Sequence, residues 1–188
     1  MADTGETETF RIRLATEADL PALHVLMGEA ITALQSELLT REQVAASHAV
    51  MGLDAQLVAD RTYLLAEDAA DVLLGCGGWS WRATLYGGDA SQVAREPAAL
   101  NPATDAARVR AMYTAPAAAR RGVGRAILAA CEGAATAAGF RRAELMATLA
   151  GERLYRACGW TVLGRTAAEV GKVSVPLVRM TKTLARKP

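Results

Sequence analysis

Residues 108–139 have the sequence RVRAMYTAPAAARRGVGRAILAACEGAATAAG, which predicts a strand, a turn and a helix in succession. The opening VRAMYT has the aromatic and β-branched content of a strand, and Pro116 ends it. Apolar residues then recur at spacings of four, four, three and four, as on one face of a helix. These residues are Val123, Ile127, Cys131, Ala134 and Ala138. Gly139 follows at the position where a helix commonly ends in a left-handed residue.

The turn before this helix is rich in arginine and glycine, with residues 119–124 reading ARRGVG. Gly122 and Gly124 have no Cβ, so a ligand can approach the backbone closely there. The first N–H groups of the helix lack helical partners, and their partial positive charge favours an anion. Forked donors suited to phosphate come from Arg120, Arg121 and Arg125. The turn predicts an anion site. The alternative is an ordinary helix start with solvated arginines. The glycine patterns of a P-loop and of a dinucleotide-binding fold are both missing here.

Length and composition indicate one globular domain. The chain has 188 residues, of which 52% are hydrophobic and 22% charged. A net charge of +1 gives no support to nucleic acid or an anionic membrane as a partner. Three cysteines form neither a metal-binding spacing nor an even set for disulfides, so we expect no metal. The first residues resemble no signal peptide, and the expected location is the cytoplasm.

The remaining elements are expected on both sides of the central stretch. We expect residues 1–9 to be disordered, 10–184 to form the domain and 185–188 to be a basic tail. Before the centre we expect a strand at 10–14, helices capped by Thr16 and Thr40 (the second holding Val44, His48 and Met51), strands at 62–66 and 72–81, and an irregular segment at 82–106. After it we expect a strand at 142–147, a short helix at 152–157 and strands at 160–163 and 173–180. Glycines at 75–78 suggest a bulge or a close backbone approach.

This element order, with two motifs, resembles the GCN5-related N-acetyltransferase (GNAT) family. Residues 119–124 occupy the family's Arg/Gln-x-x-Gly-x-Gly/Ala motif, with Ala119 where Arg or Gln is usual. Residues 154–160, LYRACGW, are similar to its second motif, Leu/Phe-Tyr-x-x-x-Gly-Phe. The resemblance implies a mixed α/β fold: a mostly antiparallel sheet of about seven strands, splayed between the fourth and fifth, with about four flanking helices.

The resemblance also implies an enzyme that moves an acetyl group from acetyl-CoA to a primary amine. The acceptor would be a small molecule or peptide that attacks directly in a ternary complex, without nucleic acid, membrane or metal. Backbone groups of Met112, Tyr113 and Thr114 would pair with pantetheine. The pyrophosphate would be held by Arg120, Arg121, Gly122, Val123, Gly124 and Arg125. Tyr155 would protonate the departing thiolate, although its sequence context alone favours a packing role.

Acceptor-side residues are less well defined by the sequence. Period two places Trp79 and Trp81 on one face of a strand, where Trp81 would wall the acceptor site with Tyr86, or simply pack. Glu29 is a further candidate for the substrate cleft. The general base stays open between a water relay and His24, His48, Glu29 or Glu37. A non-catalytic CoA-binding regulatory domain, an unrelated phosphate-ligand domain and a homodimer also stay open.

Overall fold

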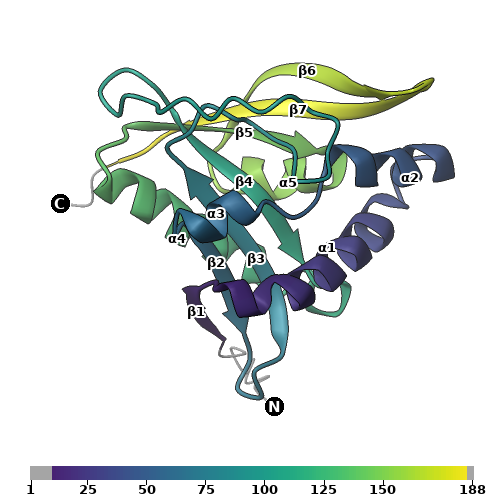
Figure 1. The fold of residues 1–188 in the computed structure, drawn as a ribbon, viewed down its shortest axis with the longest axis horizontal. Coiled ribbons are helices and arrows are strands. Elements are labelled where there is room, and N and C mark those ends of the chain that lie inside the picture. The colour runs from purple at the N-terminus through teal and green to yellow at the C-terminus, as the bar shows by residue number, and fades with distance from the viewer. Residues whose placement is uncertain (1–9, 186–188) are drawn as a thin grey trace, which may run out of the picture.

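The computed structural model describes residues 10–185 (Figure 1). The segment expected to be disordered, 1–9, and residues 186–188 of the expected tail lie outside that range. The strands are β1 Arg11–Leu14, β2 Tyr63–Glu67, β3 Leu73–Ser80, β4 Ala107–Thr114, β5 Arg142–Thr148, β6 Thr161–Val170 and β7 Val173–Thr183. The helices are α1 Leu20–Gln35, α2 Arg41–Val50, α3 Ala55–Ala59, α4 Val123–Ala137 and α5 Leu149–Ala157, with 3-10 turns η1 Glu17–Asp19 and η2 Pro116–Ala118.

The strands form one sheet in the order β1-β2-β3-β4-β5-β7-β6. Among the described strands, only β4 and β5 run parallel, and they pair at just two positions: Ala107 with Ala143, and Arg108 with Glu144. Beyond these pairs the two strands part. The predicted seven-stranded, mostly antiparallel sheet with a splay between the fourth and fifth strands is therefore confirmed.

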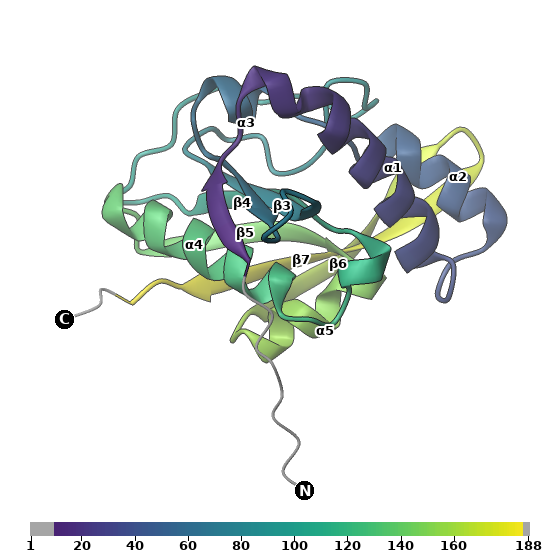
Figure 2. The same ribbon diagram turned by 90° about the horizontal axis from the view of Figure 1, so that it is seen from below.

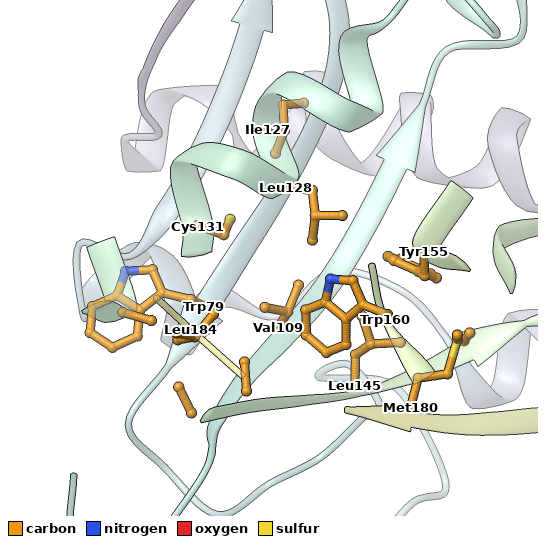
Figure 3. Packing of buried hydrophobic residues seen from close by; sticks show 14 of the residues in the cluster. Trp79, Val109, Ile127, Leu128, Cys131, Leu145, Tyr155, Trp160, Met180 and Leu184 are labelled. Atoms are coloured by element: carbon orange, nitrogen blue, oxygen red, sulfur yellow. The ribbon is translucent and has the colours of Figure 1, made fainter. Parts of the chain in front are cut away.

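Helices cover both faces of the sheet (Figure 2). On one face α4 buries Ile127, Leu128 and Cys131 in a core that also holds Trp79, Val109, Leu145 and Trp160 (Figure 3). On the other face, residues of α1 and α3 form a second core with β2 and β3; its members include Leu23, Leu26, Met27, Leu57 and Leu65. None of the helices in the described part of the chain combines the length and apolar character needed to cross a bilayer.

The helix α4 begins and ends at the predicted glycines. Gly122 is its N-cap with φ +88°, and Gly139 follows its end with φ +95°. The N–H of Phe140 then donates to the carbonyl of Ala135 at 3.1 Å, as in a glycine-terminated helix. The buried face consists of Val123, Ile127, Leu128, Cys131 and Ala135. The expectation that Ala138 lies on this face is wrong, because Ala138 is exposed. With 3.6 residues per turn, the buried face includes Leu128 and Ala135 instead.

Capping residues set the starts of the other helices. Thr16 is the N-cap of η1, which leads into α1, and its N–H donates to Asp19 Oδ2 at 2.7 Å. The predicted cap of α2 is also present, because the N–H of Gln43 donates to Thr40 Oγ1 at 3.2 Å. The helix α2 contains Val44 and His48, as expected, and Met51 is its C-cap. His48 is exposed, and the buried residues of this helix are Ala46, Ser47 and Val50.

The largest differences from the prediction are in α3, α5 and the final hairpin. The five-residue α3 was not expected; Asp54 caps it by accepting from the N–H of Gln56 at 3.2 Å. The helix α5 begins at Leu149 rather than 152, because Thr148 Oγ1 accepts from the N–H of Gly151 at 3.1 Å. The final hairpin, β6 with β7, is longer at both strands, since β6 is an exposed strand with no apolar alternation to predict it.

Candidate active site

A cavity of about 70 Å³ lies where β4 and β5 part. We call it the β4–β5 cavity. It is lined by residues of β4, β5, β7, α2 and α5, of the segment after α2 and of the loop after β3: Val50, Met51, Gly52, Leu85, Tyr86, Gly87, Val109, Arg110, Ala111, Met112, Tyr113, Met146, Thr148, Tyr155 and Leu177. The cavity therefore lies where backbone groups of β4 and β5 are not paired with each other.

A bulge in β4 forms one wall of this cavity. Cys76 pairs with Tyr113 and Gly78 with Arg110, so that two β4 residues stand opposite the single Gly77. One of the two, Ala111, has φ +49°, which is strained for a residue with a side chain. The buried Tyr63 supports this backbone, because its hydroxyl donates to the Ala111 carbonyl at 2.8 Å. The bulge frees part of β4 from its ladder with β3.

The glycines of β3 give the bulge room, as their spacing suggested. A Cβ on Gly77 would lie 2.1 Å from the sulfur of Met112 and 2.8 Å from Cγ2 of Ile127. A Cβ on Gly78 would lie 2.7 Å from the ring of Tyr63. Both distances are shorter than side chains tolerate, so a larger residue at either position would displace the bulge or its support.

The N-terminus of α4 adjoins the cavity and presents unpaired donors. Gly122 is the N-cap residue, and no side chain at this cap accepts a hydrogen bond from the start of the helix. The first N–H groups of a helix have no partner within the helix itself. A Cβ on Gly124 would be 3.1 Å from Leu154 and 3.3 Å from Thr114, so this helix start touches both α5 and the end of β4. Side chains of the predicted anion site surround it: Arg120 and Arg125 are exposed, and Arg121 donates to the carbonyl of Ala117 at 3.1 Å.

Tyr155 lies in the wall of the β4–β5 cavity and is buried. Its ring packs edge-on against Trp160 with centroids 6.2 Å apart (Figure 3). Burial raises the pKa of Tyr155 well above its ordinary value, so its hydroxyl keeps its proton at neutral pH. A protonated hydroxyl in this position has the form that a general acid needs.

The other predicted site residues divide between the cavity and places outside it. Tyr86, Met112 and Tyr113 line the cavity with Tyr155. Trp81 does not: it packs edge-on against Trp79 at 5.7 Å, next to the core beneath α4. The two tryptophans do share a face, as period two predicts. Glu29 is exposed and lines a separate shallow depression with Gly28, Thr32, Ala33 and Pro116.

No candidate for the general base reaches the cavity. His24, Glu37 and His48 are exposed on or near α1 and α2, and His48 Nε2 lies 3.2 Å from Thr32 Oγ1. The lining residues in the described part of the chain include no histidine or carboxylate.

Sequence patterns missed a buried ion cluster beside the cavity. Arg110 of β4 lies 2.6 Å from Asp54 Oδ2 through Nη1 and donates through Nη2 to the carbonyl of Gly87 at 2.8 Å. Arg95 also pairs with Asp54. Tyr113 ties the same region together, because its hydroxyl accepts from the N–H of Gly52 at 3.0 Å. The available signal was a pair of arginines at alternating positions, Arg108 and Arg110, in a strand whose other residues are mostly apolar.

Two further kinds of site, a metal centre and a reactive thiol, concern the acidic, histidine and cysteine residues in the described part of the chain. No group of three histidine, cysteine or acidic residues in 10–185 is arranged to hold a metal ion. Cys76 and Cys131 are buried free thiols, and burial raises the pKa of Cys76 to about 12. Such a thiol stays protonated and is a poor nucleophile.

The fold and cavity define an α/β protein whose sheet parts at its single parallel pair, next to an uncapped helix N-terminus. A family model, the acetyltransferase (GNAT) domain, matches residues 59–162. The chain therefore belongs to the GNAT family. No curated protein matches its sequence.

Solved structures share the fold over almost the whole chain. A GCN5-related N-acetyltransferase from Rhodopseudomonas palustris is 16% identical with a TM-score of 0.66, covering 94% of this chain and 96% of its own. A phosphinothricin acetyltransferase from Sinorhizobium meliloti, in complex with acetyl-CoA, is 18% identical with a TM-score of 0.61, covering 94% and 89%. The yncA protein of Salmonella typhimurium, with its cofactor acetyl-CoA, is 18% identical with a TM-score of 0.61, covering 96% of both chains.

Proposed function

We propose that this protein transfers an acetyl group from acetyl-CoA to a primary amine of a small molecule or peptide, by direct attack in a ternary complex. One observation carries the proposal: Tyr155 lines a cavity at the parting of β4 and β5, next to the uncapped N-terminus of α4. Membership of the GNAT family and the acetyl-CoA present in two structures of the same fold support it.

The cofactor would occupy both features together. Its pantetheine arm would pair with the backbone of residues 112–114, as an extended peptide adds to a sheet edge. The pyrophosphate would accept from the N–H groups at the start of α4, within reach of Arg120, Arg121 and Arg125. Ala119 stands where the family usually has Arg or Gln, so binding would rest on the backbone and on these three arginines.

The transfer step can be assigned to groups along the cavity. The neutral amine attacks the thioester carbonyl carbon, and the carbonyl oxygen gains negative charge. A backbone N–H of the β4 bulge would stabilise that charge. The carbon–sulfur bond then breaks, the leaving thiolate takes the proton of the Tyr155 hydroxyl, and the amine's surplus proton passes to water. Water returns a proton to Tyr155 before the next turnover.

Replacing Tyr155 with Phe tests the role of the hydroxyl. Phe keeps the ring that packs against Trp160 at 6.2 Å and removes only the acid. We expect kcat to fall by about 100-fold, with the KM for acetyl-CoA little changed. Free-thiol release at saturating amine measures both, and the melting temperature of the variant checks the fold. An unchanged kcat in the folded variant would reject Tyr155 as the acid.

The rival function is a CoA-binding regulatory domain without turnover. Both functions predict that CoA raises the melting temperature, because a ligand that binds only the folded state stabilises it. They differ in chemistry: a broad panel of amines releases thiol from acetyl-CoA only if the protein is an enzyme. Binding without release over the whole panel would favour the rival.

A further inference from the structure

The left-handed residue of the β4 bulge is an alanine. Ala111 has φ +49° and is the first of the two β4 residues that stand opposite Gly77. Bulges whose first residue is left-handed usually have glycine there, because a side chain makes this backbone conformation costly. Strain of this kind persists only where neighbouring groups hold it, and it is common at functional sites. The bulge therefore needs a support.

Tyr63 of β2 supports the bulge from outside the cavity. Its side chain is fully buried in the core that α1 and α3 form with the sheet, and its hydroxyl donates to the Ala111 carbonyl at 2.8 Å. A Cβ on Gly78 would lie 2.7 Å from the ring, so close packing holds the ring in place. Burial raises the pKa of Tyr63 well above its ordinary value, which keeps the hydroxyl protonated and able to donate.

The hydrogen bond to the Ala111 carbonyl also sets the direction of the next N–H. The described residues contain no cis peptide bond. In a planar trans peptide, the carbonyl of one residue and the N–H of the next point in opposite directions. Since the Ala111 carbonyl points at the Tyr63 hydroxyl, the N–H of Met112 points away from Tyr63.

The register of β4 places the same N–H on the side of β5. Ala115 faces β3, because its N–H donates to the Leu74 carbonyl at 2.9 Å. Successive residues of an antiparallel strand face the neighbouring strand and face away from it in turn, so Tyr113 faces β3 and Met112 faces away. On that side the two-pair ladder with β5 has ended, and Met112 lines the β4–β5 cavity. Neither ladder of the described sheet therefore uses the N–H of Met112.

We propose that Tyr63 is a positioning residue for acetyl transfer: through the Ala111 peptide, its hydroxyl directs the N–H of Met112 at the thioester oxygen. This inference rests on the proposed function. The oxygen gains negative charge during the attack, so a well-directed N–H binds it more strongly in the transition state than in the ground state. Loss of the Tyr63 hydroxyl therefore slows the chemical step more than it weakens the binding of acetyl-CoA.

The Tyr63→Phe substitution tests this role, because it removes the hydroxyl and keeps the ring. We expect kcat to fall by about 10- to 100-fold, while the KM for acetyl-CoA stays within about threefold of the parent value. Thiol release with the best acceptor of the amine panel measures both constants.

An infrared difference spectrum supplies a readout that needs no acceptor. Its probe is acetyl-CoA labelled with carbon-13 at the thioester carbonyl. A hydrogen bond from the Met112 N–H polarises this carbonyl, so its stretch in the parent complex should lie below that of free acetyl-CoA. In the Tyr63→Phe complex the stretch should return toward the free value.

Thr62→Val is the matched control, at the neighbouring position in the sequence. It also removes a buried hydroxyl that donates to a backbone carbonyl, that of Leu57 at 3.3 Å, and Thr62 does not line the cavity. We expect it to lower the melting temperature to an extent similar to Tyr63→Phe, because each variant loses one buried hydrogen bond. The kcat and the carbonyl stretch should stay unchanged.

Substitutions of Ala111 distinguish positioning from general support of the core. Glycine adopts φ +49° without strain, so the double variant Tyr63→Phe/Ala111→Gly should recover most of the lost kcat. If Tyr63→Phe does not fold, Ala111→Val tests the same backbone, because a β-branched residue strongly disfavours positive φ. The same fall in kcat and the same change in the carbonyl stretch are then expected, and an unchanged kcat would contradict the inference.

The remaining outcomes distinguish the inference from the function on which it rests. A folded Tyr63→Phe variant with unchanged kcat and carbonyl stretch overturns the inference and leaves the acetyltransferase intact. A loss of kcat that Thr62→Val shares, or that Ala111→Gly does not restore, assigns Tyr63 to general stability and also overturns the inference. Acetyl-CoA that binds to the parent protein but releases no thiol with any amine overturns the proposed function and the inference together.

Discussion

Met112 and Ile127 occupy the space that a side chain at position 77 would need, and Met112 also lines the β4–β5 cavity. The Gly77→Ala substitution would place a carbon 2.1 Å from the Met112 sulfur. We expect it to lower the free energy of unfolding by about 1–3 kcal/mol and to reduce acetyl-CoA turnover by displacing the bulge. Denaturant unfolding and thiol release measure the two effects.

Gly164→Ala provides the control for that substitution. Gly164 also lies at a register shift in a strand, but no atom lies within 4 Å of a Cβ placed there. We expect its stability to change by no more than about 0.5 kcal/mol. Equal effects of the two substitutions would show that glycine matters in these strands for flexibility and not for close packing.

At the scale of residues, the sequence predicted some features of the site and missed others. The glycine run of β3 predicted a close approach, and Tyr155 was found through a motif. Arg110 was missed because its partners, Asp54 and Gly87, are 56 and 23 positions away and no local pattern brings them together. Period two placed Trp81 on the face of Trp79, but only tertiary structure shows that this face packs beneath α4.

The helix α4 allows a test of the cofactor site at the scale of an element. The Gly122→Ala substitution adds a methyl group in open space before the helix N-terminus, where the pyrophosphate is proposed to lie, and strains a backbone with φ +88°. We expect the affinity for CoA to fall at least about tenfold, which corresponds to 1.4 kcal/mol. Calorimetric titration with CoA measures it.

Gly133→Ala in the same helix separates binding from stability. Gly133 lies in the interior of α4, is exposed and has no atom within 4 Å of an added Cβ. Alanine there should stabilise the helix by about 0.5–1 kcal/mol and leave CoA affinity unchanged. A loss of affinity in both variants would contradict the proposed position of the pyrophosphate.

Elements differ in how well the sequence predicts them. The boundaries of α4 could be predicted because glycines mark both ends and its apolar period is long. The short α3 has too few residues to show a period, and β6 is exposed along most of its length, so neither carries a pattern. The parting of β4 and β5 came from family resemblance, since it depends on two strands that are separated by α4.

Acid stability belongs to the whole molecule, because one cluster ties its N-terminal edge to the sheet. Arg13 donates to Asp19 at 2.7 and 2.8 Å and to Glu67 at 2.6 and 2.9 Å, which joins β1, η1 and β2. Hydrogen bonds from Arg13 hold the pKa of Asp19 and of Glu67 below their usual values. These carboxylates contribute stability above their unfolded pKa values of about 4, and the contribution is lost as the pH falls below that.

The Asp19→Asn substitution tests this account. We expect it to lower the melting temperature by about 3–6 °C at pH 7, because the charge-assisted hydrogen bonds from Arg13 are lost. The difference from the parent protein should shrink as the pH falls below about 4, since the parent loses the same bonds. Glu17→Gln, a change at an exposed neighbour in η1, should leave the melting curve unchanged. A deficit that is constant with pH would contradict the role of the ionised carboxylate.

The two-position pairing of β4 with β5 has a consequence for cooperative unfolding. The sheet ladder hardly connects residues 11–114 to residues 142–183, so other elements must connect the two halves. One is α2, whose Ala46 and Val50 share a core with Val175 and Leu177 of β7. The other is α4. Ile127 packs against the backbone of β3, while Glu132 accepts from Trp160 Nε1 at 2.8 Å and from Lys182 Nζ at 2.6 Å. The same helix begins at the proposed pyrophosphate site. The helix that would bind the cofactor therefore also helps to connect the two halves of the sheet.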